Sequence, residues 1–349
     1  MGSGMTEKTL PAGELHRLIR DLLRALGTPD DLAGLVTGAL VEANLTGHDS
    51  HGLVRMPAYA QSVREGKVHP EVRASVVSRR GATACVSANR GWGQTAGRVA
   101  AEEASEIAGE LGVGAVVLQE SPHVGRLADY VELIARRGRV AMAATNAWVN
   151  VAPFGGRDRR LGTNPIAFGI PRAADRPPIV SDFATSVVAE GKLQVARAYG
   201  RSVAPGAIVD SEGRPTQDPE EFYSGGALLP AQGYKGYGLA VAIEALGGAL
   251  SGMGPAMLAD YGDGNGMFVL ALEIEAFASV ERFVSQIEQM AQALLDAPTA
   301  PGVDEVLLPG QLELRTREQR ERDGIPIPAG TWDAIAQLAE ELDVSIPSV

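Results

Sequence analysis

Amphipathic helices are predicted at both ends of the chain, and a region of alternating strands and helices separates them. Leucine and isoleucine recur at helical spacing from Leu15 to Leu23 and stop at Gly27, and a second helix is predicted from about Asp30 to Leu45. Near the other end, the stretch Thr331–Leu342 has one apolar face, made by Trp332, Ile335, Leu338 and Leu342. Because such faces must be buried against another element, we expect the two ends to form a joint helical subdomain.

The middle of the chain is predicted to be mixed α/β. Paired strands are expected at Val72–Ser78 and Thr83–Ser87, around the turn Arg80-Gly81. After them, a helix at Ala96–Leu111 is followed by short apolar strands at Gly114–Leu118 and Val140–Ala144. The fold class is therefore α/β, with the sheet region inserted between the terminal helices.

Charge and apolar content exclude several classes of partner. The 349 residues carry 31 basic and 43 acidic side chains, a formal charge of -12, so we expect no nucleic-acid partner and no binding to anionic membranes. No apolar run approaches 18 residues, so no membrane span is expected. The single cysteine, Cys85, lies in an expected strand and fits a reducing, cytoplasmic environment.

The turn Gly47-His48-Asp49-Ser50-His51-Gly52 is the strongest candidate site. It lies between two helical stretches, and Arg55 and Tyr59 follow it on the second. Histidine exchanges protons near neutral pH, and arginine offers a planar fork that matches a carboxylate. These side chains suit an enzyme that acts on a small organic acid. The competing interpretation, that His48 and His51 are a solvated helix end, is weakened by Arg55 and the flanking glycines.

A glycine-rich turn at Gly91-Trp92-Gly93-Gln94-Thr95-Ala96 resembles a dinucleotide fingerprint, because it follows a strand and precedes a helix. Two features argue against that interpretation. The next acidic residue at a strand end, Glu120, comes late for a ribose-binding acid, and the strand before the turn belongs to an expected hairpin. A helix start attracts anions in any fold, so the turn alone does not indicate a Rossmann domain.

Polar clusters farther along the chain also fall between strands and helices. Ser121-Pro122-His123-Val124-Gly125 comes directly after an expected strand, where functional residues of α/β proteins often lie. Asp182 follows the apolar Ile179-Val180, and as a helix N-cap it would have a purely structural role. Lys235 opens an apolar helix that continues from Leu239 to Leu250, and a bound anion would relieve its unfavourable position near the helix dipole.

The loop between Gly155-Gly156 and Gly162-Thr163-Asn164-Pro165 contains Arg157, Arg159 and Arg160. It suits a phosphate, but exposed arginines in a turn are also ordinary. Both interpretations stay open at this stage.

Taken together and in this order, the motifs at Gly47–Tyr59, Ser121–Gly125, Gly162–Pro165, Ser181–Ser186 and Lys235–Gly238 resemble the malate/L-lactate dehydrogenase family, which is distinct from the classical Rossmann lactate dehydrogenases. The resemblance covers nearly the whole chain. The segments Gly156–Thr163 and Leu308–Gln311, followed by Arg317–Trp332, resemble its hydroxycarboxylate dehydrogenase B branch most.

The resemblance implies a non-Rossmann fold, with a helical domain built from both termini and a mixed-sheet cofactor domain. It implies an N-terminal helical part (5–70), an α/β region for cofactor binding and dimerisation (71–300) and a C-terminal segment that returns to the helical domain (301–349). It also implies a homodimer, NAD or NADP as cofactor, and a 2-hydroxy or 2-oxo carboxylic acid as substrate. No metal site is expected.

Matched by motif, three residues take catalytic roles: His123 as the proton donor or acceptor, His51 as a second polar group at the reacting carbon, and Asp182 as the group that sets the histidine tautomer. Ser50, Arg55 and Tyr59 would bind the substrate. The residues that would contact NAD(P) are His48, Ser121, Ser181, Asp182, Phe183, Lys235, Pro309, Gly310 and Gln311.

Some residues depart from the family pattern. Tyr234 stands where many members have histidine, Pro122 replaces a polar residue, Arg126–Asp129 replaces a glycine-rich stretch and Gln311 replaces a frequent glutamate. The family's substrates therefore do not transfer directly. Two further functions remain open: reduction of a cyclic imino acid or 2-imino acid at the same site, and non-catalytic binding of a nucleotide or organic acid.

Overall fold

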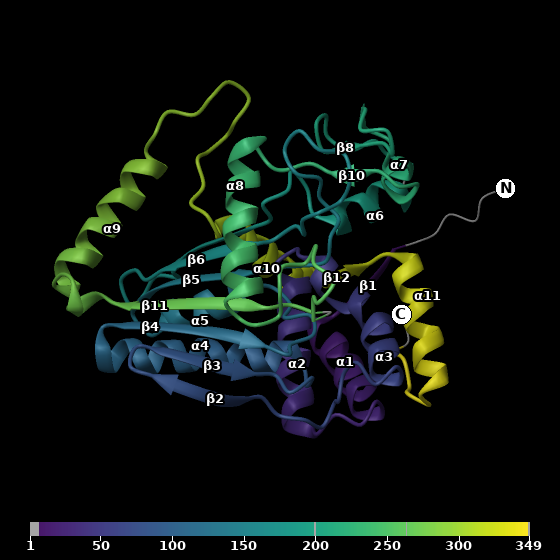
Figure 1. Cartoon of the computed structure of the whole chain (residues 1–349), viewed down its shortest axis with the longest axis horizontal. Helices are drawn as coiled ribbons and strands as arrows, with labels where there is room; N and C mark the ends of the chain where they lie inside the picture. The colour runs from purple at the N-terminus through teal and green to yellow at the C-terminus, as the bar shows by residue number, and fades with distance from the viewer. Residues whose placement is uncertain (1–6, 199, 263, 348–349) are drawn as a thin grey trace.

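A mixed sheet of seven strands lies at the centre of the computed structural model, which describes residues 7–198, 200–262 and 264–347 (Figure 1). In spatial order its strands are β2 (Ser75–Arg80), β3 (Thr83–Ser87), β4 (Val113–Gln119), β11 (Met267–Glu273), β5 (Arg139–Thr145), β6 (Ile166–Ile170) and β7 (Ile179–Phe183). In this sheet β3 and β4 are parallel, and the other neighbouring pairs are antiparallel. The predicted α/β class is confirmed, although the first strand begins at Ser75 rather than Val72.

Two helices cover one face of the sheet. Helix α4 (Gly93–Leu111) packs on β3, β4 and β11, and α5 (Ala128–Arg136) packs on β5, β6 and β7. The contact is close because α4 presents small side chains: Ala100, Ala104 and Ala108 are completely buried. A Cβ at Gly114 on β4 would lie 2.0 Å from the Ala104 carbonyl oxygen, so only glycine allows this approach. His123 follows β4 in the chain, so the packing of α4 on β4 positions the loop that carries this histidine.

The opposite side of the sheet carries α8 (Tyr234–Ile243), which continues as the π-helical turn η3 (Glu244–Ala249) against β5 and β11 (Figure 1). The sequence predicts a helix that Gly233–Gly238 opens and that continues to Leu250; the structure begins it at Tyr234, as expected, but changes its winding at Glu244. The buried Glu244 carboxylate accepts from Asn146, Asn164 and the Ala256 amide.

The helices from the two ends of the chain share one hydrophobic core, as their apolar faces predict. It contains α1 (Ala12–Ala25), α2 (Asp30–Leu45), α3 (Met56–Arg64) and α11 (Ala329–Glu341). The antiparallel pair β1 (Lys8–Leu10) and β12 (Ile325–Ile327) joins the termini beside them. The boundaries at residues 70 and 300 stay a prediction, and residues 5 and 6 lie outside the described residues.

A small lobe and an arm complete the molecule, and neither was predicted from the sequence. The lobe has α6 (Glu190–Ala198), α7 (Pro219–Tyr223) and the strands β8 (Ile208–Val209), β9 (Pro215–Thr216) and β10 (Ala227–Leu228). The arm is α9 (Val280–Leu295), which stands away from the body and returns through a long loop to α10 (Gln311–Asp323) (Figure 1).

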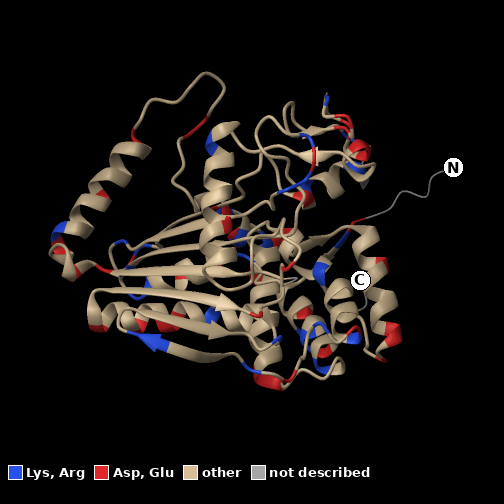
Figure 2. Ribbon diagram, in the orientation of Figure 1, with Lys and Arg blue, Asp and Glu red and all other residues tan. Residues whose placement is uncertain are grey.

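Charged side chains of both signs are interspersed over the outer helices and the small lobe, and the strands of the central sheet carry few of them in this view (Figure 2). Within the described ranges, no helix is both long enough and apolar enough to cross a membrane.

Candidate active site

The histidine-bearing turn is held by the end of α2. After this helix come the short 3-10 turns η1 (Asp49–His51) and η2 (Leu53–Arg55). The buried Asn44 side chain donates to Asp49 at 2.7 Å and accepts from the Leu53 amide at 2.8 Å. A Cβ at Gly52 would lie 2.1 Å from Asn44 Oδ1, so glycine is required where the chain passes this amide. The turn is therefore a fixed structure rather than a solvated helix end.

Hydrogen bonds within this turn connect Arg55 to Ser50 and Ser50 to His51. Arg55 donates from Nε to the Ser50 carbonyl oxygen at 2.5 Å, and the Ser50 hydroxyl lies 3.0 Å from His51 Nδ1. Among the described residues, no carboxylate pairs with Arg55. Because Nε is used to fix its stem, the terminal nitrogens of the guanidinium are left to bind an acid.

His123 meets this turn from the other side, although it lies 64 residues after Tyr59. Its Nδ1 is 2.7 Å from the Tyr59 hydroxyl, which also accepts from Gln94 Nε2 at 2.6 Å. The rings of His51 and His123 stack with centroids 5.5 Å apart. With Nδ1 occupied by Tyr59, Nε2 of His123 is the nitrogen left for a substrate, and a hydroxyl partner can serve either protonation state.

Burial and nearby positive charge keep both histidines neutral. Desolvation, followed by the charge of Arg55, lowers the pKa of His51 to about 3 and the pKa of His123 well below its ordinary value. Desolvation also raises the pKa of Tyr59 to about 12, so its phenol keeps its proton. A neutral His123 can accept a proton from a hydroxyl group, and the Arg55 charge that depresses its pKa is one that a bound carboxylate would neutralise.

The depressed histidine pKa values predict a loss of stability in mild acid. A histidine whose folded pKa lies below its unfolded value of about 6.5 binds its proton more readily in the unfolded chain. For each such histidine, the free energy of unfolding is unaffected above that pH. Below it, the free energy of unfolding falls by about 1.4 kcal/mol per pH unit until the folded pKa is reached. We expect the melting temperature of His51→Gln to fall less steeply than that of the unchanged protein between pH 7 and pH 5.

The same comparison removes the main confounding groups. Burial raises the pKa of the Asp129 and Asp182 carboxyls, which has the opposite effect on the pH dependence, but both carboxyls are present in the two proteins. Melting curves measured in parallel therefore isolate His51. Equal slopes for the two proteins would show that His51 is not held neutral.

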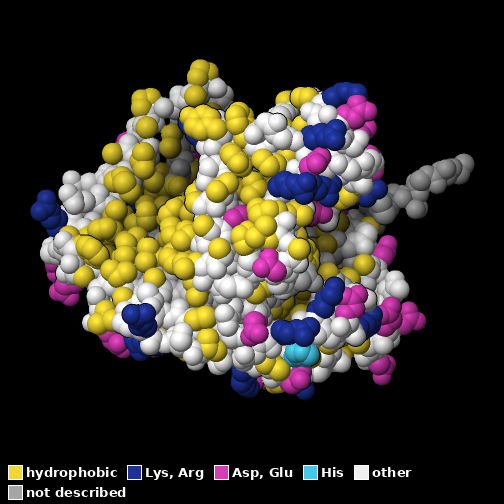
Figure 3. Space-filling model, in the orientation of Figure 1, with side chains coloured by type: hydrophobic (Ala, Val, Ile, Leu, Met, Phe, Trp, Pro, Cys, Tyr) yellow, Lys and Arg dark blue, Asp and Glu magenta, His cyan; other side chains and the backbone are white. Residues whose placement is uncertain are grey.

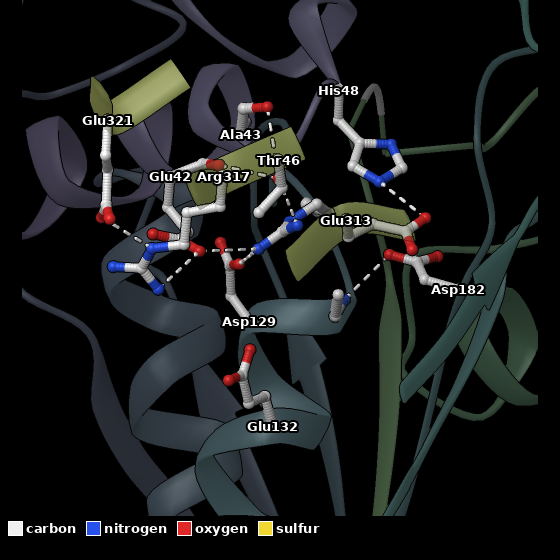
Figure 4. A network of polar contacts seen from close by, with 12 residues as sticks. Glu42, Ala43, Thr46, His48, Asp129, Glu132, Asp182, Glu313, Arg317 and Glu321 are labelled. Atoms are coloured by element: carbon white, nitrogen blue, oxygen red, sulfur yellow. Dashed lines mark hydrogen bonds and ion pairs between the residues drawn. The ribbon is translucent and has the colours of Figure 1, made fainter. Parts of the chain in front are cut away.

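A second cluster lines a pocket beside the turn, next to the start of α10 (Figure 4). Three predicted site residues lie there: His48, Asp182 and Gly310. Gly310 has φ 90° and precedes α10, and a Cβ there would lie 3.1 Å from the Val180 carbonyl oxygen. Five of the other lining residues are charged: Glu42, Arg126, Glu132, Glu313 and Arg317.

Asp182 differs from its predicted roles in two respects. It belongs to β7, and the next helix begins only at Glu190, so it is not a helix N-cap. Its carboxylate accepts from the Ala128 amide at 2.8 Å, whereas Nδ1 of His123 is bound by Tyr59. The hydrogen bonds thus assign the orientation of His123 to Tyr59 rather than to Asp182.

The other predicted cofactor residues are more scattered. Ser121 is buried, and its hydroxyl donates to the Pro122 carbonyl oxygen at 3.0 Å. Gln311 accepts from the Leu308 amide at 2.7 Å, so its side chain closes its own loop. Phe183 is exposed, as are Pro309 and Lys235, and neither these three nor the half-buried Ser181 lines the pocket.

The two glycine-rich segments have structural roles. A Cβ at Gly93 would lie 2.4 Å from the His123 carbonyl oxygen, so the turn at Gly91 lets α4 approach the strand end that carries this histidine. In the arginine loop, Arg159 donates to the Phe222 and Gly226 carbonyl oxygens and stacks on the Phe222 ring. Arg157 and Arg160 lie near Asp158.

Asn44 and Gln94 are parts of the site that were not predicted from the sequence. Both are buried polar side chains on otherwise apolar helical faces, and that is the signal by which a sequence could reveal them. Arg126 was noted only as a departure from a family pattern, yet it is buried and lines the pocket.

Comparison with known proteins shows the family of the chain. Residues 10–336 match the family model described as malate/L-lactate dehydrogenase. The chain is 36% identical to hydroxycarboxylate dehydrogenase B of Escherichia coli K12, covering 95% of this chain and 93% of the relative. The crystal structure of malate dehydrogenase from Entamoeba histolytica superposes with a TM-score of 0.92 at 26% identity, covering 98% of this chain and all of the other. A Δ1-piperideine-2-carboxylate reductase from Pseudomonas syringae gives a TM-score of 0.83 at 30% identity, covering 95% of this chain and all of the other.

Proposed function

Because the chain belongs to the malate/L-lactate dehydrogenase family, we propose that it transfers hydride between NAD(P) and C2 of a small 2-hydroxy or 2-oxo carboxylic acid. One observation carries this proposal: His123, oriented by Tyr59, faces the turn on which Arg55 has no carboxylate partner among the described residues. A proton-transfer group beside a carboxylate-binding group is what this reaction needs from a protein.

We propose that the pocket beside the turn receives the nicotinamide cofactor. His48 and Asp182 offer a donor and an acceptor for ribose hydroxyls or a carboxamide, and Gly310 belongs to the same lining. We propose that these three residues hold the cofactor, together with Ser121, Ser181, Phe183, Lys235, Pro309 and Gln311. When bound, the nicotinamide supplies or accepts the hydride.

The chain's own residues supply position and a proton. Arg55 binds the substrate carboxylate, assisted by Ser50, and so fixes the acid in the site. His123 takes the hydroxyl proton at Nε2 during oxidation and returns it to the oxygen during reduction, while Tyr59 holds Nδ1. His51 stacks on the same ring and adds a polar group beside the reacting oxygen.

Imine reduction is the second candidate, because the Pseudomonas syringae protein that superposes over 95% of this chain is a Δ1-piperideine-2-carboxylate reductase. The same proton and the same carboxylate-binding group would serve a cyclic imino acid. To separate the two functions, NADH and NADPH consumption is followed at 340 nm with a panel of 2-oxo acids, with and without methylamine, and with a cyclic imino acid. Turnover of an oxo acid without amine supports the first function, and turnover confined to imines supports the second.

We further propose a homodimer. Hydrophobic side chains gather in the hollow between α9 and α8 (Figure 3). Exposed large apolar side chains are carried by β6 (Phe168), α8 (Val241) and α9 (Met290 and Leu294). Soluble monomers rarely expose a continuous patch of this kind, and a second copy of the chain would cover it.

Light scattering after size-exclusion chromatography tests the homodimer. We expect twice the 36.5 kDa chain mass for the unchanged protein and a monomer for Met290→Glu/Leu294→Glu. Leu35→Glu, at an exposed position on α2, is the matched control and should remain dimeric. A monomeric unchanged protein would refute the assembly.

With its single cysteine, the enzyme is proposed to work in the cytoplasm.

A further inference from the structure

We propose that Arg126 is a positioning residue that keeps the two histidine-bearing segments in register. One segment is the loop after β4, where His123 comes three residues before Arg126. The other is the turn after α2, where Thr46 comes five residues before His51. This inference rests on the proposed function, since both histidines act in the same reaction there.

The contacts of Arg126 support this role. Its side chain is 5% exposed, and each of its three nitrogens donates to a protein oxygen. Nη1 donates to the Thr46 hydroxyl at 2.6 Å, while Nε and Nη2 donate to the Asp129 carboxylate at 3.1 and 2.6 Å. The Thr46 hydroxyl in turn donates to the Glu42 carbonyl oxygen at 2.7 Å, at the end of α2. A single guanidinium thus connects the last turn of α2 to the first turn of α5.

The charges around Arg126 explain why the side chain stays in place. Asp129 and Glu42 lie 2.6 and 3.9 Å from Nη2, and Arg317 approaches Glu42 from the α10 side at 3.3 Å (Figure 4). Removing a buried partner of such a network leaves uncompensated charge. The Asp182 carboxylate is joined to the same loop through the Ala128 amide. The bridge therefore connects three segments that the chain places far apart: residues 42–46, 126–129 and 182.

Only the planar fork of arginine makes this bridge. Lysine has one nitrogen, so it can keep the ion pair with Asp129 or the bond to Thr46, but not both geometries together. A displacement of about 1 Å at a reacting group costs on the order of 10²-fold in rate. Loss of Arg126 should therefore change the relative position of the two histidines more than it changes the stability of the fold.

The test uses two independent changes, Arg126→Lys and Thr46→Val, the second of which removes the hydroxyl while preserving side-chain shape. For each variant we would measure kcat and KM with the best 2-oxo acid, the Kd of NADH by fluorescence, and the melting temperature. We expect kcat at saturating NADH to fall about 10- to 100-fold in both variants. Because Arg126 and Thr46 also line the proposed cofactor pocket, the Kd of NADH is measured only to set the saturating concentration. Arg139→Gln is the matched control. It breaks an ion pair between Arg139, at the start of β5, and Glu273 on β11, and neither residue lines the pocket. It should lower the melting temperature and leave kcat unchanged.

Two outcomes would overturn the proposal: an unchanged kcat in Thr46→Val, or an equal kcat loss in Arg139→Gln. A readout without turnover separates this proposal from the proposed function. In the ligand-free protein, the imidazole NMR signals of His51 and His123 should shift in Thr46→Val and not in Arg139→Gln. If no 2-oxo acid is reduced by the unchanged protein, these signals still decide whether Arg126 sets the register.

Discussion

Replacement of His123 by alanine is expected to lower kcat by about 10²- to 10⁴-fold, the usual contribution of a positioned acid or base. The Kd of NADH should stay within about threefold of the unchanged protein, because His123 contacts Tyr59 and His51 and does not line the pocket that holds His48 and Asp182. Steady-state turnover of a 2-oxo acid and a fluorescence titration with NADH measure the two quantities separately.

Two further variants define what the loss means. His16→Ala changes a histidine on α1, away from the site, and should keep full activity. Tyr59→Phe keeps His123 but removes its Nδ1 partner, so we expect a smaller loss than for His123→Ala. Turnover of His123→Ala at the unchanged rate would exclude this residue from the proton step and leave His51 as the candidate.

The parts of the fold that were predictable are those in which local pattern decides the structure. Helix α2 occupies Asp30–Leu45 and strand β3 occupies Thr83–Ser87, as the apolar periodicity indicates. The arm α9 was not predicted, although its amphipathic sequence carries the same kind of local pattern; its packing on the body through residues such as Ala291 is not specified locally. The order of the sheet strands, with β11 between β4 and β5, joins segments more than 120 residues apart, and no local pattern specifies that.

The candidate site divides in the same way. The turn from Gly47 to Arg55 concentrates reactive side chains in a few residues, so a single sequence reveals it. The orientation of His123 comes from Tyr59 and Gln94, which lie on different helices and meet only in the folded chain. Asp182 was expected to set the His123 tautomer, but its carboxylate accepts from the Ala128 amide instead. These are contacts between distant segments, which composition and spacing do not determine.

Arg55 and His123 are coupled through charge. After desolvation, the Arg55 guanidinium is the next cause that lowers the pKa of His123. A substrate carboxylate bound to Arg55 would neutralise that charge, so the pKa of His123 should rise when an acid binds. His123 would then be protonated for reduction in the substrate complex rather than in the free enzyme. An acid that does not bind Arg55 would leave His123 unprotonated.

Replacement of Arg55 by lysine should therefore lower kcat/KM for a 2-oxo acid by about 10²-fold, since a charge-assisted hydrogen bond of the fork contributes about 1.5–3 kcal/mol. Most of the loss should appear as a higher KM, because the lysine ammonium keeps the charge but cannot form two parallel bonds. Arg64→Lys is the matched control: it lies on α3, pairs with Glu341 at the surface, and should leave both constants unchanged. Equal kcat/KM in Arg55→Lys and the unchanged enzyme would show that the substrate carboxylate binds elsewhere. The rise of the His123 pKa on substrate binding would then need a different cause.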